Sequence, residues 1–434
     1  MRTILLAPFC LAVALMSGAG RAAVNIEQWT APSGARVYFV ASRNLPMLDV
    51  QIDFAAGSVY GPAGKAGVAG LTVGLLDAGA RVGGTLLDEE QIAAKLVDTG
   101  ARLSGSADHD RASLRLRTLT SERSAALELM RAVLTAPSFP DAVLAREKAR
   151  TISGIQEAAT RPDTIAAKRF EEAIYPNHPY GATASEESVA RITRDDLVDF
   201  WRGHFGARRA VVAIIGDVSR ADAEAIAQQL TADLPPSPAA QPSPAVTLPQ
   251  RETIRLAHPA TQSHIHIGMP ALKRTDADYF PLLVGNYTLG GGGFVSRLMQ
   301  EVREKRGYAY SVYSYFAPRT LEGPFEIGLQ TKREQAGAAI KLVEELLADF
   351  LRKGPTEAEL RAAKQNLIDG QALRLDSNSK ILGYLSLIGF YGLPLSYIED
   401  FPRRIEAVTT KQVREAFARH VRPENLVTVI VAGD

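Results

Sequence analysis

The histidines are the first side chains in this sequence that could do specialised chemistry, as metal ligands. His264 and His266 are two residues apart in an alternating segment, so both would lie on one face of a strand. This spacing could suit a metal ion, but no further ligand is evident nearby, and we favour a polar strand face. His204 and His420 fall at corresponding helix ends, where the helix dipole stabilises a positive charge, so their repetition indicates a structural role. Two further histidines, His109 and His178, lie in turn-like or loop-like sequence.

An unusual run of glycines, Gly290, Gly291, Gly292 and Gly293, is the second candidate site. It lacks the Gly-Lys-Ser/Thr ending of a phosphate-binding loop, which argues against nucleotide binding. Two interpretations stay open. The run could be a hinge between helices, or its bare backbone could let an extended ligand approach closely.

The segment that follows, Phe294 to Ser314, predicts a helix that ends at Gly307 and turns into a strand. Arg303 would lie near the helix end and Tyr310 on the strand. A basic residue at a helix C-terminus is also common for purely structural reasons, because it binds the last carbonyl groups. On its own, the segment therefore leaves its role open.

The elements that must position these residues are repeated along the chain. A Pro-, Ser- and Ala-rich stretch over residues 234–250 predicts an extended linker between two halves of similar size. Each half ends with a helix, a histidine and an apolar strand that closes on Gly-Asp, at Asp217 and at Asp434. The same features in the same order indicate an internal repeat.

Apolar spacing within the halves mixes strands with helices. The alternating segment from Leu48 to Phe54 predicts a half-buried strand, and the segment around Ile265 predicts its counterpart. Helical stripes stop before Pro137 and at Gly354, and Thr356 has capping-box spacing to the glutamate that follows. We therefore expect two α+β domains, each a mixed β-sheet covered on one face by α-helices.

Length, charge and the N-terminus set further limits. The 434 residues exceed one ordinary domain, and the formal charge of +1 does not favour a nucleic acid partner. Cys10, the single cysteine, excludes a disulfide framework and a cysteine-based zinc site. Arg2 and the apolar run after it predict a signal peptide over residues 1–22, cleaved near Ala22. We expect a periplasmic or secreted protein without a membrane span, comprising an N-terminal domain (23–233), the linker (234–250) and a C-terminal domain (251–434).

The sequence resembles the pitrilysin/insulinase family of zinc metallopeptidases over essentially the whole mature chain. The likeness includes the segment from Gly290 to Tyr310, the stretches around Ala55–Ser58 and Ala63–Leu71, the central linker and the Gly-Asp strand ends. The resemblance implies two similar α+β domains in a chain of this size. It also implies that pairs of such chains enclose a chamber around an unfolded peptide.

Active members of that family carry His-x-x-Glu-His, in which the histidines bind zinc and the glutamate activates the attacking water. The matching stretch here places Gly70 and Gly74 at the ligand positions and Val73 at the position of the general base. A later glutamate ligand aligns near Gly154, and Glu147 matches an acidic neighbour of the site. Glycine has no side-chain donor atom, so the resemblance implies no metal site in this chain and zinc in a homologous partner.

The second-half signature of the family is present. In active assemblies an Arg/Tyr pair lies across the chamber from the zinc, where it holds the substrate carbonyl and stabilises the oxyanion. Arg303 and Tyr310 match that pair in type and spacing, and Tyr308 is a further candidate because it would share a strand face with Tyr310. The run Gly290–Gly293 resembles, in shorter form, the glycine-rich segment of the non-catalytic subunit of mitochondrial processing peptidases.

The sequence therefore predicts a non-catalytic, substrate-binding subunit of a heterodimeric zinc peptidase, whose partners are a zinc-bearing homologue and an unfolded peptide. One alternative is a zinc-free homodimer that binds peptides or acts as a chaperone. Another is a structural subunit, like the core proteins of respiratory complexes that share this fold. A serine hydrolase is disfavoured because the sequence contains no Gly-x-Ser-x-Gly elbow.

Overall fold

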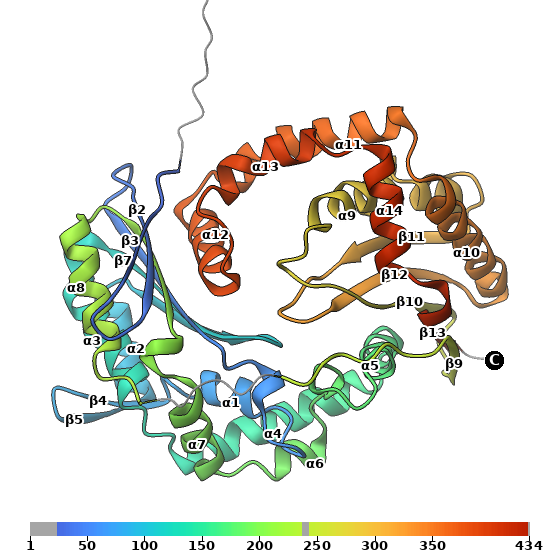
Figure 1. Ribbon diagram of the computed structural model, residues 1–434. Helices are drawn as coiled ribbons and strands as arrows, with labels where there is room; N and C mark the ends of the chain where they lie inside the picture. The colour runs from blue at the N-terminus through green and yellow to red at the C-terminus, as the bar shows by residue number, and fades with distance from the viewer. Residues whose placement is uncertain (1–23, 237–242, 433–434) are drawn as a thin grey trace, which may run out of the picture.

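The computed structural model describes residues 24–236 and 243–432, arranged as two similar halves (Figure 1). The predicted signal peptide lies outside the described residues. The N-terminal half contains the strands β1 (Glu27–Thr30), β2 (Arg36–Ala41), β3 (Met47–Phe54), β4 (Gly79–Val82), β5 (Thr85–Asp88), β6 (Arg102–Ala107), β7 (Ala112–Leu119) and β8 (Val211–Gly216). Its helices are α1 (Val68–Gly74), α2 (Glu89–Asp98), α3 (Arg123–Thr135), α4 (Asp141–Ala158), α5 (Pro162–Ile174), α6 (Glu186–Ala190), α7 (Arg194–His204) and α8 (Arg220–Thr231).

The C-terminal half repeats this plan. Its strands are β9 (Glu252–Ala257), β10 (Gln262–Leu272), β11 (Ala309–Phe316), β12 (Gly323–Lys332) and β13 (Val427–Ala432). Its helices are α9 (Tyr279–Asn286), α10 (Ala336–Lys353), α11 (Glu357–Asp369), α12 (Asn378–Tyr391), α13 (Tyr397–Glu406) and α14 (Thr410–His420), with π-helical segments η5 (Tyr287–Gly291) and η7 (Met299–Glu304). None of the helices in the described part of the chain is both long and apolar enough to cross a membrane.

The two sheets confirm the predicted duplication. The N-terminal sheet has the strand order β1-β2-β8-β3-β7-β6, and the C-terminal sheet has the order β11-β12-β10-β13-β9. Reading the second sheet backwards matches β9, β13, β10, β12 and β11 to β2, β8, β3, β7 and β6. In both sheets the equivalent pair (β2 with β8, β9 with β13) is parallel and the following pairs are antiparallel. Both sheets are therefore mixed, as predicted.

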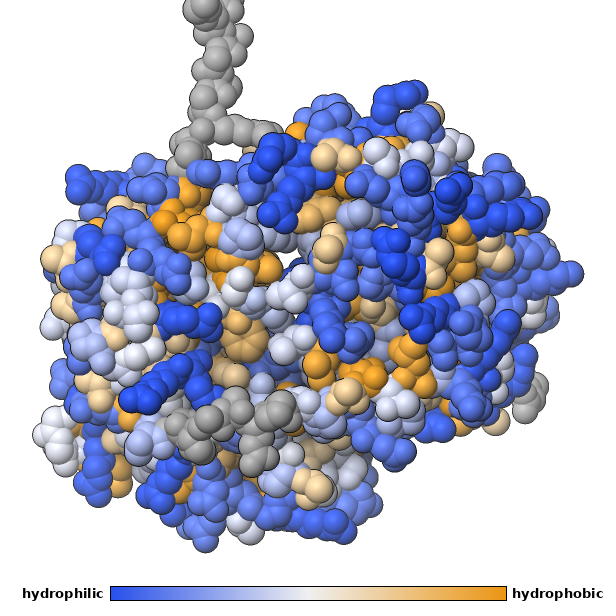
Figure 2. Space-filling view, viewed as in Figure 1, coloured by the Kyte–Doolittle hydropathy of each residue, from blue (hydrophilic) through white to orange (hydrophobic). Residues whose placement is uncertain are grey.

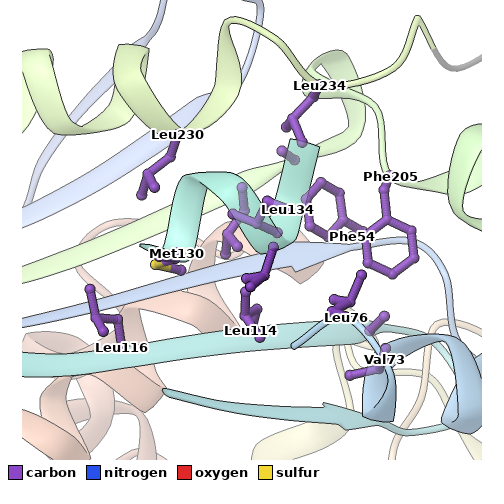
Figure 3. Packing of buried hydrophobic residues seen from close by; sticks show 14 of the residues in the cluster. Phe54, Val73, Leu76, Leu114, Leu116, Met130, Leu134, Phe205, Leu230 and Leu234 are labelled. Carbon is purple, nitrogen blue, oxygen red and sulfur yellow. The ribbon is translucent and has the colours of Figure 1, made fainter. Parts of the chain in front are cut away.

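Each half buries one face of its sheet under its own helices. In the N-terminal half, the apolar residues of β3 and β7 pack with α1, α3, α7 and α8 around Phe54, Leu114 and Met130 (Figure 3). The predicted helical stripes are confirmed, since α3 ends before Pro137 and α10 ends before Gly354. Thr356 caps α11 in a capping box with Glu359, also as predicted.

The opposite faces of the sheets are covered by an exchange of helices between the halves. Helix α12 from the C-terminal half packs on β2, β3 and β8, and helix α5 from the N-terminal half packs on β10 and β13. The hydrophobic cores follow the exchange, because Val211 and Tyr38 belong to the core of the C-terminal half, and Phe170 packs with Val429. Figure 2 shows hydrophobic residues gathered around the recess between the halves and hydrophilic residues along the outer edge.

This exchange corrects one expectation from the sequence. The polar side of β3 was expected to face solvent, but Asp49 and Asp53 are both 0% exposed. Asp53 accepts hydrogen bonds from Gln51 at 2.8 Å and from Ser386 of α12 at 2.5 Å. Asp49 is bound by Arg117 at 2.8 Å. The alternation indicated two faces correctly, but a helix from more than 300 residues away covers the polar one.

Candidate functional site

The segment that carries Arg303 ends its helix where the sequence predicts. Gly307 has φ +61°, in the left-handed region that favours glycine. Its N–H donates to the carbonyl of Arg303 at 2.8 Å, and the N–H of Tyr308 donates to the carbonyl of Val302 at 2.9 Å. This pattern terminates a helix and satisfies its last carbonyl groups. The chain then enters β11, so Arg303 lies on the last helical turn and Tyr310 at the start of the strand.

The guanidinium group of Arg303 contacts two aromatic rings. Its central carbon is 4.8 Å from the ring centroid of Phe294 and 4.7 Å from that of Tyr310. The Arg303 side chain is also 3.4 Å from the carboxylate of Glu304. Cation–π contacts with two rings restrict the guanidinium, whose N–H groups can still donate hydrogen bonds. Sequence reasoning missed Phe294; the signal was an exposed aromatic residue directly after the glycine run.

Tyr310 is positioned by an irregularity in the sheet. Ala309 pairs with Thr331 and Ser311 with Gln330, so Tyr310 is an extra residue at a β-bulge. A bulge bends its strand and redirects the side chain of the extra residue. As a result the Tyr310 side chain is 79% exposed, although the strand around it is part of the sheet.

Arg303 and Tyr310 line a common pocket of about 420 Å³, together with Tyr308, Gln330 and Lys332. Tyr308 was expected to share a strand face with Tyr310. The structure places Tyr308 before the first residue of β11, half-buried against the C-terminal core. The two tyrosines therefore line the same pocket, Tyr308 from the turn before β11 and Tyr310 from the bulge within β11.

Close packing inside the protein explains why three of the four residues in the run are glycine. A Cβ atom on Gly290 would lie 2.5 Å from the backbone nitrogen of Ser314 in β11. A Cβ atom on Gly291 would lie 2.6 Å from the amide of Asn286, and one on Gly292 would lie 2.6 Å from the carbonyl of Tyr287. Only Gly293, with φ +60°, faces open space. Gly290 thus lets η5 lie tightly against β11, while Gly291 and Gly292 leave room for residues of the preceding helical turn.

Helix α1 occupies the position of the family's zinc motif and offers no ligand. Gly70 and Gly74 are exposed, and a Cβ atom on either would have no neighbour within 4 Å. Val73 is buried in the N-terminal core, where Figure 3 shows it beside Leu76. Gly154 on α4 is equally open. Packing therefore does not demand glycine at these three positions, and none of the four side chains could bind zinc or accept a proton.

The acidic neighbour expected at that position is already paired. Glu147 lies 3.0 Å from Arg146 and 3.9 Å from Arg150, both on the same helix, α4. Its carboxylate is therefore neutralised locally. Together with the glycines of α1, this leaves the first half without the donor set of a zinc peptidase.

The histidine pair of the C-terminal half lies on one face of β10, as expected. His266 Nδ1 is 2.7 Å from Glu326 Oε1, and its ring stacks on Phe170 at 5.6 Å. Partial burial holds the pKa of His264 below its ordinary value. The favoured interpretation, a polar strand face, agrees with these contacts.

The repeated helix-end histidines do not behave alike. Burial, helped by Arg209, lowers the pKa of His204 to about 4, so this side chain is neutral at pH 7 and not the cation that its position suggested. His420 Nε2 lies 3.0 Å from Asp278, which also binds Arg419 through two contacts of 2.8 Å. Within residues 24–236 and 243–432, His420, Asp276 and Asp278 form the one group of acidic and histidine side chains close enough to share a metal ion. The contact with Arg419 gives Asp278 a cationic partner within the protein.

Comparison with known proteins agrees with this geometry. A family model described as the peptidase M16 inactive domain matches residues 191–367. The crystal structure of a peptidase M16 inactive domain from Pseudomonas fluorescens is 38% identical to this chain, with a TM-score of 0.89 over 94% of this chain and 98% of that one. The match extends over both halves and the linker.

More distant relatives point the same way. The non-peptidase homolog YmxG of Helicobacter pylori is 25% identical over 408 residues, which is 92% of this chain and 91% of that protein. The periplasmic protease PqqL of Escherichia coli shares the fold, with a TM-score of 0.80 at 18% identity over 95% of this chain and 46% of its own. The predicted relationship to the pitrilysin/insulinase family is confirmed: the chain belongs to the M16 peptidase family, as a member without the catalytic zinc motif.

Proposed function

We propose that this chain is the substrate-holding subunit of a two-chain zinc peptidase that acts in the periplasm or outside the cell. Its partner is a homologous subunit that carries His-x-x-Glu-His and the zinc ion. The chain described here supplies Arg303 and Tyr310 to the partner's site. The substrate is an unfolded peptide held between the two subunits.

The observation that carries this proposal is the contrast between the two halves. In α1, Gly70, Val73 and Gly74 provide no metal donor and no general base. In the C-terminal half, Arg303 and Tyr310 are held against one another beside an open pocket. A chain that binds and polarises a substrate without attacking it has a clear use only beside a subunit that supplies the nucleophile.

Arg303 and Tyr310 suit the stabilisation of a peptide oxyanion. When water attacks a peptide carbonyl, negative charge develops on the carbonyl oxygen, and fixed hydrogen-bond donors lower the barrier. A guanidinium and a phenol are both hydrogen-bond donors, and the guanidinium adds a positive charge. The contacts with Phe294 and Tyr310 hold the guanidinium in place before the substrate binds, which lowers the cost of ordering it.

The proposed location rests on the sequence of the N-terminus. Residues 1–22 have the charged start, apolar run and small residues of a secretory signal. The mature chain would contain no cysteine, which suits an oxidising compartment. The structural likeness to the periplasmic protease PqqL is consistent with this location.

Native affinity purification of the mature chain from its own host tests the proposal. The expected result is a stoichiometric partner of similar size that carries His-x-x-Glu-His and binds zinc, and a mixture of the two that hydrolyses an unfolded peptide. A homodimer that binds peptides without a zinc-bearing partner would contradict the proposal. It would favour instead a peptide-binding or chaperone-like protein.

A further inference from the structure

The C-terminal sheet has a second group of polar and aromatic side chains beyond the Arg303–Tyr310 pocket. It lies on the face opposite the helical core, where α5 covers β13 and part of β10. On the half of that face formed by β11 and β12, the residues are Tyr313, Tyr315 and Glu326, with His266 of β10 at the edge of α5. We refer to these four residues as the Glu326 cluster.

Glu326 is a buried carboxylate that has no lysine or arginine partner among the described residues. The residue is 5% exposed, and among the described residues its one ion-pair contact is with His266, at 2.7 Å. Tyr315 donates a hydrogen bond to the other carboxylate oxygen at 2.5 Å. Buried Asp110 is likewise held by tyrosines, Tyr180 and Tyr391. By contrast, Asp49 binds two arginines, and half-buried Glu171 lies 2.6 Å from Arg319. A carboxylate has about four acceptor positions, so Glu326 can still bind a cation.

The two tyrosines form an aromatic surface beside this carboxylate. The rings of Tyr313 and Tyr315 are nearly parallel, with centroids 5.9 Å apart and an angle of 14° between their planes. Both side chains are 38% exposed. Burial and the charge of Glu326 raise the pKa of both phenols, so they stay neutral. Stacked, electron-rich rings next to a carboxylate are suited to a Lys or Arg side chain.

A glycine in the neighbouring strand makes this surface possible. Gly328 pairs directly with Tyr313, and a Cβ atom on Gly328 would lie 2.3 Å from the Tyr313 hydroxyl. The ring of Tyr313 therefore lies flat across β12.

The Glu326 cluster is continuous with the Arg303–Tyr310 pocket. Gln330 of β12 lines that pocket and lies four residues along the strand from Glu326. From Tyr310 to Tyr315 the strand advances about 15 Å, which an extended peptide covers in about five residues. A peptide whose carbonyl contacts Arg303 can thus reach the cluster with a side chain further along.

We propose that the Glu326 cluster is a specificity subsite for a cationic side chain, Lys or Arg, of the bound peptide, about five residues from the bond that Arg303 addresses. The proposal rests on the proposed function, because it assumes that an extended peptide lies across this sheet. Glu326 would bind the cation directly, while Tyr313 and Tyr315 contact it through their ring faces. His266 would hold the carboxylate in place from the side of α5.

Two fluorescent peptides of about 12 residues test the subsite, long enough to span both sites at about 3.3 Å per residue. They are unstructured and identical except that one contains arginine and the other contains citrulline, which has nearly the same shape without the charge. Fluorescence anisotropy measures their binding to the complex of the mature chain with its zinc subunit, from which the zinc is removed to prevent cleavage. The expected result is about tenfold tighter binding of the arginine peptide, a preference that falls below about twofold in Glu326→Gln and in Tyr313→Ala.

Two control variants separate this subsite from other effects. Glu304→Gln removes the same charge from an exposed position beside Arg303, and it should keep the preference for arginine. Arg303→Ala should also keep the preference, because it leaves the cluster intact. Tyr313→Ala changes a half-exposed side chain, so it tests the subsite even if Glu326→Gln unfolds.

The outcomes are distinguishable from those for the proposed function. Equal binding of both peptides by the wild-type chain, or an unchanged preference in Glu326→Gln and Tyr313→Ala, would overturn the subsite and leave peptide holding intact. If the complex bound neither peptide, the proposed function itself would be contradicted, and the subsite with it.

Discussion

The guanidinium carbon of Arg303 lies 4.7 Å from the centre of the Tyr310 ring, although one residue belongs to a helical segment and the other to a strand. Arg303 ends a helical turn, and Tyr310 is the extra residue of a β-bulge. The left-handed Gly307 between them turns the chain so that the side chains meet. Their contact thus depends on a helix end, a tight turn and a bulge acting together.

Phe294 should matter for activity although it is not itself a hydrogen-bond donor. Phe294→Ala removes one of the two rings that hold Arg303, so we expect turnover by the complex to fall a few-fold, because the guanidinium loses part of its positioning. Phe294→Tyr should restore it. Val295→Ala, which changes the adjacent exposed residue, is the control. Equal turnover of the two alanine variants would show that Phe294 does not position Arg303.

We expect alanine substitutions at Gly290 and Gly70 to have opposite effects on stability. Gly290→Ala should lower the free energy of unfolding by about 2 kcal/mol, because the new methyl group would press on the backbone of Ser314. Gly70→Ala should raise it by about 0.5–1 kcal/mol, because this position is helical, exposed and open. Urea unfolding of the mature chain measures both. Similar effects of the two changes would mean that η5 is not packed against β11 as described.

Ser386 fastens α12 to the N-terminal sheet. Its hydroxyl donates to Asp53 at 2.5 Å and accepts from Gln51 at 2.9 Å and Arg111 at 2.8 Å. Ser386→Ala removes these bonds inside a buried site and should cost about 2 kcal/mol in urea unfolding. Ser379→Ala removes a single, half-buried contact to Arg115 and should cost less than about 1 kcal/mol. The reverse order would contradict the polar docking of α12.

His204 should make the protein less stable in mild acid. Burial and Arg209 lower the pKa of His204 from 6.5 to about 4 in the folded state. Between these two pH values, His204 is protonated in the unfolded chain and neutral in the folded chain. Stability therefore falls as the pH drops below about 6.5, and continues to fall down to about 4. The variant His204→Gln lacks this titrating group. Between pH 6.5 and 4, the Tm of the variant should therefore fall by a few degrees less than the Tm of the wild type. Parallel Tm profiles would show that folding does not lower the pKa of His204.

Some of the structure could be predicted because its causes are local. The end of a helix at Gly307 follows from the conformational freedom of glycine, and the start of α11 follows from a capping box. The duplication was visible because both halves close with the same helix and strand. The α+β class followed from apolar spacing alone.

Other features depend on residues that are distant in sequence. Asp49 and Asp53 alternate with apolar residues, which indicates a solvent face, but α12 covers them. His204 has the position of a helix-capping cation, but Phe200 and Tyr60 surround its ring. The candidate site was predicted in part: Arg303 and Tyr310 were recognised through their spacing, whereas Phe294 and the bulge depend on how the strand pairs.

Turnover by the reconstituted complex tests the central claim most directly. The mature chain is combined with its zinc subunit, and hydrolysis of an unfolded peptide is measured together with zinc content. Arg303→Ala should lower kcat about 100-fold, because it removes an oxyanion donor, and should leave zinc content unchanged. Arg306→Ala, which removes an exposed arginine paired with Glu301, should have little effect. If complexes that contain Arg303→Ala and Arg306→Ala hydrolysed the peptide with the same kcat, Arg303 of this chain would not contribute to the chemistry of the complex.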